Sequence, residues 1–146
     1  GQRTNVQSDW MMERNLRVLK QKMAALRRLF ASDPRVLGVF LFGSQADGTA
    51  TPRSDIDLAV LFARELTLRE ELTFESAISN ELGTDAIDVV NLNRANLLLR
   101  FRAISGKLLY ARDQVRVADF IEDTLIAYRD FEPRAQAALR DYLVTL

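Results

Sequence analysis

The 146-residue sequence contains no cysteine and no histidine. Without cysteine the chain can form neither a disulfide framework nor a thiolate metal site, and nothing in it demands an oxidising compartment. The two absences together exclude a Ser-His-Asp triad, a cysteine nucleophile and an ordinary zinc site. The phosphate-binding pattern GxxxxGK[ST] is missing as well, so the chain is not a P-loop protein.

Long apolar runs are also lacking. No run approaches the roughly 18 to 20 residues that a membrane-spanning helix needs, and the N-terminal segment GQRTNVQSDW is polar. We therefore expect a soluble, cytoplasmic protein that makes no membrane contact. The length and the 48% hydrophobic content fit one core, and the chain is too short for two independent domains. We expect a single domain over 6–146, with its core at about 10–112, a C-terminal helical segment at about 113–146, and residues 1–5 as a tag remnant or disordered.

The net charge is zero, but the charges are unevenly distributed. Residues 1–53 contain 9 Lys or Arg against 4 Asp or Glu, whereas residues 54–146 contain 11 against 16. Most of the positive charge lies in one predicted helix, on Arg14, Arg17, Lys20, Lys22, Arg27 and Arg28. A docking surface for an anionic partner and an ordinary solvated helix face both fit this pattern. The balanced total charge favours the solvated face and argues against direct nucleic-acid binding.

The first part of the sequence predicts a helix, a buried strand, a loop and a second strand. From about residue 9 to 31, apolar residues recur every three or four positions, the period of an amphipathic helix, which Asp33-Pro34 then ends. Residues 36–42, VLGVFLF, carry no polar side chain and predict a buried strand. Residues 43–54 are rich in Gly, Ser, Thr and Pro and predict a loop, and residues 55–62 predict the next strand.

The second part continues the alternation of helices and strands. Residues 66–82 predict a helix, with Thr67 and Glu70 spaced as a capping box and Gly83 placed as a left-handed C-terminal cap, and residues 85–92 predict a strand. The remaining predictions are a short helix over 94–104 with Asn93 as N-cap and Gly106 as its stop, a short strand over 107–110, and a helical segment over 115–146 interrupted near Pro133. This order predicts an α/β or α+β domain with a small mixed sheet flanked by helices.

Two acidic residues on one strand are the most informative feature of the sequence. In an extended strand Asp55 and Asp57 project from the same face, with Cα atoms roughly 6.6 Å apart, while Ile56 and Leu58 project from the other. Two like charges this close on a half-buried surface lose hydration and repel each other unless a cation lies between them. Oxygen ligands of this kind suit Mg²⁺ or Mn²⁺ bound together with substrate phosphates.

Gly43-Ser44 follows directly after the preceding strand, and ten residues separate it from Asp55. Glycine there permits a tight turn whose amides and serine hydroxyl approach an anion closely. Asp88 is a third carboxylate inside an apolar strand, IDVV. Three strand carboxylates at one point are the ligand set of two-metal phosphoryl or nucleotidyl transfer, in which positioning and charge neutralisation supply most of the catalysis. For Asp55 a cap or turn role, and for Asp88 an ion pair with an arginine, are the structural alternatives.

With this spacing the chain resembles the DNA polymerase beta-like nucleotidyltransferase superfamily, and within it the minimal nucleotidyltransferases of prokaryotes. Further segments that resemble the antitoxins of HEPN/MNT toxin-antitoxin pairs are SDIDLAVLF, IDVVNLN, AISGKLLYARD and DFEPR. The resemblance implies a small mixed sheet flanked by helices, and an enzyme that uses ATP and Mg²⁺ to transfer AMP to a tyrosine of a HEPN-domain RNase toxin, with which it forms a hetero-oligomer.

The resemblance also implies the roles of individual residues. Gly43 and Ser44 would hold the triphosphate, and Arg53 would add positive charge that is missing at Gln45 and Asp47. Asp55, Asp57 and Asp88 would be the metal ligands and the catalytic residues, with Asp88 helping to deprotonate the tyrosine hydroxyl. Two alternatives stay open: an antitoxin that neutralises by occlusion without catalysis, and a transferase acting on a small hydroxylated molecule.

Overall fold

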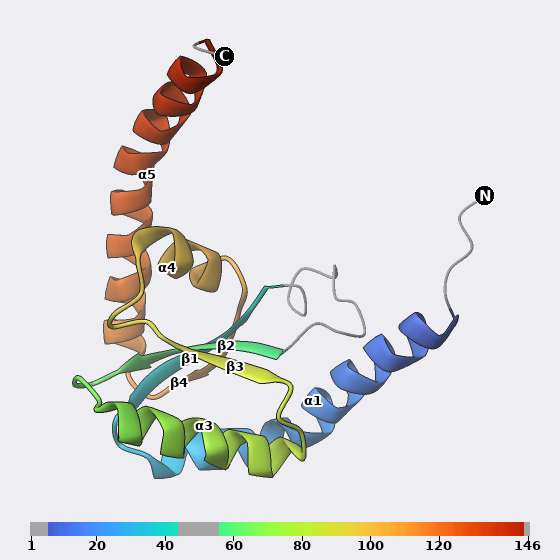
Figure 1. The fold of residues 1–146 in the computed structure, drawn as a ribbon. Coiled ribbons are helices and arrows are strands. Elements are labelled where there is room, and N and C mark those ends of the chain that lie inside the picture. The colour runs from blue at the N-terminus through green and yellow to red at the C-terminus, as the bar shows by residue number, and fades with distance from the viewer. Residues whose placement is uncertain (1–5, 44–55, 145–146) are drawn as a thin grey trace.

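The computed structural model describes residues 6–43 and 56–144. This part of the chain forms a four-stranded sheet with helices on both faces, in the order helix, two strands, then helix and strand in alternation (Figure 1). The elements are α1 (Val6–Ser32), β1 (Val36–Phe42), β2 (Ile56–Phe62), α3 (Leu68–Leu82), β3 (Ile87–Asn91), α4 (Leu97–Ile104), β4 (Lys107–Ala111) and α5 (Gln114–Val144). The expected α/β (α+β) class and the predicted order of elements are confirmed.

The sheet is mixed, with strand order β3-β2-β1-β4. β1 pairs antiparallel with both β2 and β4, and β2 pairs in parallel with β3. The two central strands are buried on both faces, as the uninterrupted apolar run VLGVFLF predicts. The parallel pair requires a crossover, and α3 provides it.

Each face of the sheet carries its own apolar cluster. Alternate residues of β1, β2 and β3 pack against α1 and α3, with Phe30 and Ile78 fully buried between them. The residues in between pack against α4 and α5, around Phe40, Leu92 and Val117. Burying a large apolar side chain of this kind contributes about 1.5 to 3 kcal/mol. Ile56, Leu58 and Ile87 belong to the first cluster, so Asp57 and Asp88 project toward the α4 face, as the period of two predicts.

Both ends of α3 follow the sequence prediction. The Thr67 hydroxyl accepts a hydrogen bond from the Glu70 amide at 3.2 Å, and the Glu70 carboxylate accepts one from the Thr67 amide at 3.0 Å. Gly83 caps the other end with a φ of +70°, and its N–H donates to the Ser79 carbonyl. The Glu70 carboxylate also forms ion pairs with the guanidinium groups of Arg64, at 2.6 Å, and Arg35, at 3.0 Å.

Replacing Glu70 by glutamine is expected to lower the melting temperature by a few degrees at neutral pH. Hydrogen bonds from Arg64 and from the Thr67 amide lower the pKa of Glu70 from 4.5 to about 2. A carboxylate whose folded pKa is depressed stabilises the fold fully above its unfolded pKa, and this contribution disappears as the pH falls to about 2. Thermal melts of the wild type and Glu70→Gln should therefore differ above pH 4.5 and converge near pH 2.

The matched control for this comparison is Glu65→Gln. Glu65 is exposed, and its side chain makes no ion pair in the described segments. The melting temperature of the Glu65→Gln variant should follow that of the wild type across the pH range. An equal decrease in melting temperature in both variants would mean that overall charge, and not the hydrogen bonds and ion pairs of Glu70, sets the stability.

The predicted N-cap of the helix over 94–104 is wrong. α4 begins at Leu97 and is capped by Asn96, whose side chain accepts a hydrogen bond from the Leu99 amide at 2.9 Å. Asn93 instead bonds to the end of β2: its Oδ1 accepts from the Phe62 N–H, and its Nδ2 donates to the Phe62 carbonyl, each at 2.9 Å. This long-range pairing explains why the helix starts three residues later than expected.

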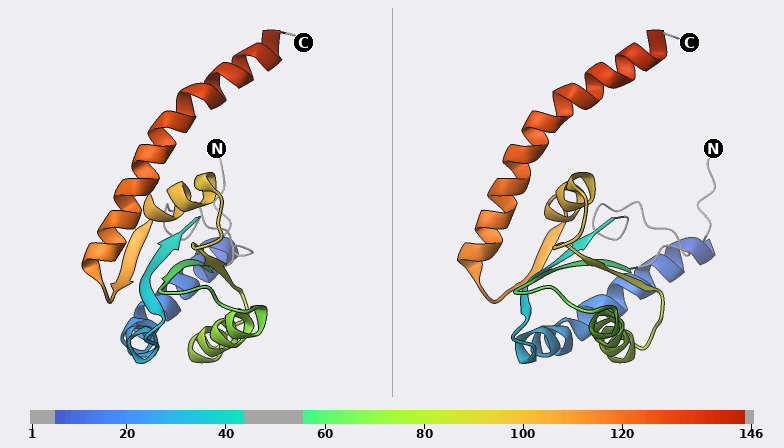
Figure 2. Two further views of the ribbon diagram at one scale, coloured as in Figure 1. Left: turned by 90° about the vertical axis from the view of Figure 1, so that its left-hand side faces the viewer. Right: turned by 60° about the vertical axis from the view of Figure 1, so that its left-hand side comes forward.

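The predicted interruption at Pro133 is also wrong, because α5 runs through this residue. Proline in a helix removes one backbone hydrogen bond and crowds the preceding turn, which a long helix accommodates by bending. Figure 2 shows α5 curving as it extends past α4 and away from the sheet. Near its middle Tyr128 stacks on Phe101 of α4, with ring centroids 3.7 Å apart.

The described helices include none that combines the length and the apolar character of a membrane span.

Candidate active site

Gly43 follows the last residue of β1 and has a φ of +71°, a conformation that residues with a Cβ rarely adopt. A Cβ added at this position would collide with Oδ2 of Asp57. Both observations require glycine here, because the backbone turns tightly against the Asp57 carboxylate. The backbone at Gly43 therefore passes directly over the Asp57 carboxylate, and its approach to a phosphate stays a prediction.

Asp57 and Asp88 lie side by side. They are register partners in the parallel pairing of β2 with β3, so their side chains project from the same face of the sheet, on strands about 4.8 Å apart. Asp57 is half-buried and Asp88 is exposed. Strand pairing thus brings together two acidic residues that are 31 positions apart in the sequence, as the candidate site requires.

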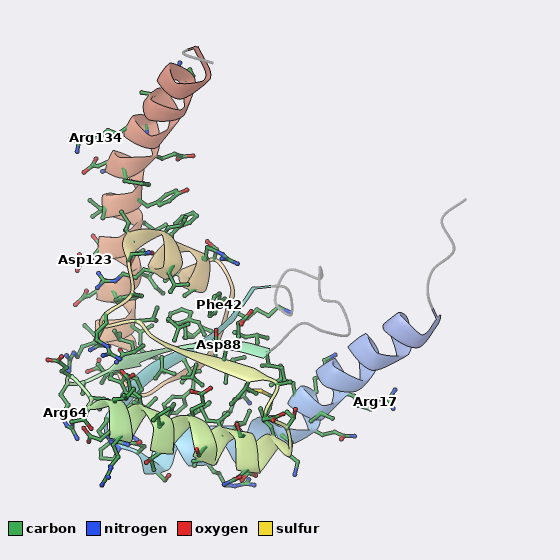
Figure 3. The ribbon with its side chains drawn as sticks, in the orientation of Figure 1. Arg17, Phe42, Arg64, Asp88, Asp123 and Arg134 are labelled. Carbon is green, nitrogen blue, oxygen red and sulfur yellow. The ribbon has the colours of Figure 1, made fainter. Side chains whose placement is uncertain are left out.

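Phe42 completes a row across three strands, and the sequence analysis did not assign it to the site. It pairs with Asp57 in the antiparallel register of β1 with β2, and its side chain is buried. By strand register, Phe42 and Asp88 therefore lie on the two sides of Asp57. Figure 3 labels Phe42 and Asp88 on their strands. The row gives the acidic pair one apolar neighbour, which lowers the local dielectric and strengthens charge interactions at the site. Only the strand register reveals this, because Phe42 looks like any core residue in the sequence.

Glu75 of α3 is a second residue that the sequence analysis missed. Burial raises the pKa of its carboxyl, and the negative charge of Asp88 raises it further. The acidic character of this corner therefore extends from β3 to α3. Glu75 follows Glu71 by one helical turn, which indicates a common helix face, but nothing local in the sequence places Asp88 beside it.

Three of the predicted site residues, Ser44, Arg53 and Asp55, lie outside the described residues. Within 6–43 and 56–144, no three Asp or Glu side chains come together as a group that could hold a metal ion. Asp57 and Asp88 nevertheless fit a hard divalent cation, because two carboxylates on one face of neighbouring strands supply the oxygen donors that Mg²⁺ and Mn²⁺ prefer. The three-carboxylate set remains a prediction whose third member would be Asp55.

This arrangement suits the transfer of a phosphate-containing group. A turn with a positive φ at Gly43 brings backbone close to the Asp57 carboxylate. Asp57 and Asp88 would hold a divalent cation, which would supply positive charge to neutralise phosphate. Such a site needs no nucleophilic side chain of its own, consistent with the absence of cysteine and histidine.

Comparison with known proteins agrees with this geometry. Residues 24–115 match the family described as Polymerase beta, Nucleotidyltransferase. The chain is 30% identical over 111 residues to the protein adenylyltransferase MntA of Shewanella oneidensis, covering 75% of this chain and 78% of the relative. It is 36% identical over 93 residues to the protein adenylyltransferase MntA of Aphanizomenon flos-aquae, covering 57% of this chain and 62% of the relative.

Similarity to a solved structure extends over most of the fold. A crystal structure of a toxin-antitoxin with AMP-PNP contains a chain that is 25% identical, with a TM-score of 0.63, and the alignment covers 90% of this chain and 98% of that one. The family match includes β1, the Asp57 strand β2 and the Asp88 strand β3, so it covers every described residue of the candidate site. The chain therefore belongs to the polymerase beta nucleotidyltransferase family.

Proposed function

We propose that this nucleotidyltransferase is an antitoxin that transfers AMP from ATP to a tyrosine of a HEPN-domain RNase toxin and thereby neutralises it. Similarity to two proteins named protein adenylyltransferase MntA supports the protein acceptor. The relative solved as a toxin-antitoxin with AMP-PNP supports both the toxin partner and an adenine nucleotide as donor. The toxin and this chain would form a hetero-oligomer in the cytoplasm.

The observation that carries the proposal is the pairing of Asp57 with Asp88 beside the Gly43 turn. A structural role for Asp88 as the partner of an arginine would leave an ion pair at this position, and none is found among the described residues. Asp88 is instead exposed next to a second carboxylate, which is the placement a nucleotide-bound cation requires.

Each residue has a defined task in the proposed reaction. The backbone of Gly43, with Ser44 and Arg53, holds the phosphates of ATP, and Asp57 with Asp55 and Asp88 holds Mg²⁺ or Mn²⁺. When bound, the cation neutralises phosphate charge and orients the leaving pyrophosphate. Asp88 accepts the proton of the tyrosine hydroxyl, whose oxygen forms a bond to the α-phosphorus as the bond to pyrophosphate breaks. The products are an AMP-tyrosine ester and pyrophosphate.

Intact-protein mass spectrometry tests this function. The purified chain is incubated with Mg²⁺, ATP and the HEPN-domain protein encoded by its neighbouring gene as the proposed toxin, and that protein is expected to gain the mass of one or more AMP units. The control replaces ATP with α,β-methylene-ATP, which has carbon in place of the oxygen that leaves with pyrophosphate, and no mass should be gained. A toxin that binds the chain, is neutralised and gains no mass with ATP would support occlusion instead of catalysis.

A further inference from the structure

β3 forms one edge of the sheet, and Asp88 lies on it. Among the described strands β3 pairs only with β2. The Ala86 carbonyl accepts from the Ile56 N–H and the Leu92 N–H donates to the Val60 carbonyl, so the even-numbered residues bond to β2. In a parallel pair, alternate residues bond to opposite sides, so Ile87, Val89 and Asn91 direct their backbone N–H and C=O groups outward. The Asn91 carbonyl accepts from the Arg94 N–H at 3.2 Å, so the groups left for pairing are those of Ile87 and Val89 and the N–H of Asn91. The outer edge of β3 can therefore pair with an added strand.

The side chains of β3 alternate between two environments. Asp88 projects toward the α4 face, whereas Val89 and Asn91 project toward α3. On the α3 side the strand borders a cleft of about 160 Å³ between β3 and the first half of α3. Its lining includes Phe62, Leu68, Leu72, Glu75, Val89 and Asn91. A strand added to β3 would thus place successive side chains beside Asp88 and over this cleft in turn.

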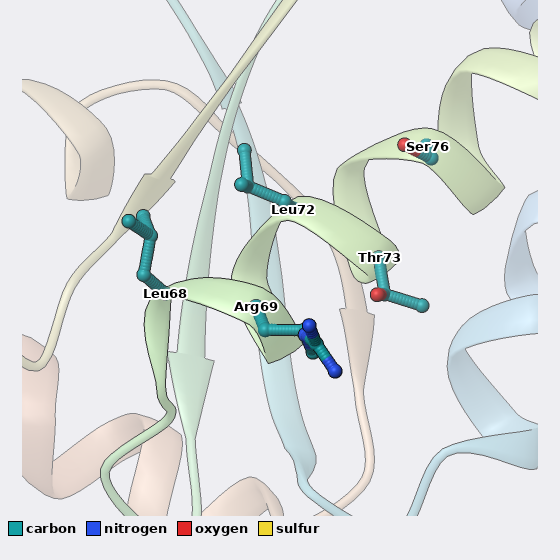
Figure 4. A pocket seen from close by; sticks show the side chains of 5 residues that line it. All are labelled: Leu68, Arg69, Leu72, Thr73 and Ser76. Atoms are coloured by element: carbon teal, nitrogen blue, oxygen red, sulfur yellow. The ribbon is translucent and has the colours of Figure 1, made fainter.

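The rim of the cleft is apolar and unusually exposed. Leu68 is 69% exposed and Leu72 is 55% exposed, although both belong to a helix that packs on the sheet. Figure 4 shows these two leucines on the same side of α3, as their spacing of four residues requires. They also line a second, open hollow along the outer face of the helix, with Arg69, Thr73 and Ser76. Apolar surface therefore lies close to Asp88, the proposed proton acceptor, because the next residue on the strand, Val89, borders the same cleft as the two leucines.

Charge at the cleft is negative. Glu71 is satisfied, because it forms an ion pair with Arg94 and accepts a hydrogen bond from Asn91. Glu75 and Asp85 form no ion pair within the part of the chain that the structure describes, and both line a neighbouring hollow that Leu72 also borders. An occupant with a basic side chain next to an apolar one would match this surface.

We propose that the outer edge of β3 receives the acceptor segment of the partner protein as an added strand. The acceptor residue pairs with Asp88 and projects from the same face, so its hydroxyl reaches the carboxylates. The next residue of the segment is apolar and enters the cleft beside Leu68 and Leu72, and a basic residue lies near Glu75 and Asp85. Main-chain hydrogen bonds then fix the register, and the cleft selects the sequence. The inference rests on the proposed function, because it assumes that a protein hydroxyl is the acceptor.

The exposed face of α5 is the competing surface. Leu125 and Ile126 are 48% and 44% exposed, and α5 extends away from the sheet (Figure 2). A partner bound only there would have no contact that aligns its acceptor residue with Asp88. The β3 edge is favoured because the same strand carries the reacting site and the docking groups.

Two matched double variants distinguish the surfaces. Leu68→Ser with Leu72→Ser should raise the KM for the toxin in AMP transfer by about tenfold and leave the affinity for Mg²⁺-ATP unchanged, because both leucines are exposed and lie outside the phosphate site. Leu125→Ser with Ile126→Ser removes the same chemistry from α5 and should leave KM unchanged. The opposite pattern, with only the α5 variant impaired, would overturn the inference.

Hydrogen exchange on the complex tests strand addition directly. In the free chain the amides of Ile87, Val89 and Asn91 should exchange quickly, and in the complex with toxin and α,β-methylene-ATP they should become protected. Unprotected β3 amides in a stable complex would contradict the inference, whether or not AMP is transferred in the separate assay with ATP. Protected amides without any AMP transfer would retain the docking surface and reject the proposed function.

Discussion

Replacing Asp57 by asparagine is expected to lower the rate of AMP transfer by about 10³-fold, the scale reached when one preorganised charge-stabilising group is lost from an active site. Asparagine keeps the shape of the side chain and removes its negative charge. The register with Asp88 and the contact with the Gly43 turn make this carboxylate the centre of the site. The fold should persist, because the change also removes one of two adjacent like charges. The rate of AMP transfer is measured from the mass of the toxin over time, and the affinity for Mg²⁺-ATP is measured by calorimetry.

The matched control is Asp119→Asn. Asp119 is exposed on α5 and borders a hollow at the other end of the sheet, near Leu37 and Phe62. This variant should transfer AMP at the wild-type rate. An Asp57→Asn enzyme that is equally active would show that Asp57 has no part in catalysis. An inactive variant that still neutralises the toxin would favour occlusion over catalysis.

Replacing Gly43 by alanine is expected to have the second largest effect. The added methyl group meets the Asp57 carboxylate, and the φ of +71° costs alanine about 1 to 2 kcal/mol. Relief of the collision must displace either the turn or the carboxylate. A displacement of about 1 Å at a catalytic group costs on the order of 10²-fold in rate. Both the rate of AMP transfer and the free energy of unfolding should therefore fall.

Gly83→Ala separates the two causes. Gly83 has nearly the same φ, +70°, but a Cβ there meets no atom within 4 Å. This variant should lose the stability that the left-handed conformation alone costs and keep its transfer rate. If Gly43→Ala behaved in the same way as Gly83→Ala, the close packing of Gly43 on Asp57 would have no functional weight.

Local signals in the sequence predicted the elements that depend on neighbouring residues. The apolar run over 36–42 predicted β1 with its observed bounds, because a strand buried on both faces needs no partner information to be recognised. Thr67, Glu70 and Gly83 predicted both ends of α3 for the same reason, since each cap is formed within four residues.

A contact between distant residues accounts for the error at the start of α4. Asn93 and Asn96 are both good caps by their chemistry, and only the hydrogen bonds of Asn93 to Phe62, 31 positions away, decide between them. The same limit applies to the site. The period of two predicted the face of Asp57, but the register that places it beside Asp88 and Phe42 is a property of strand pairing.

The two strands that carry the acids differ in how firmly they are held. β2 has hydrogen-bonded neighbours on both sides, whereas β3 has a described neighbour on one side only. Opening of a strand that is bonded on one side costs less free energy, so Asp88 should fluctuate more than Asp57. An incoming strand would stiffen the proton acceptor at the moment the substrate arrives.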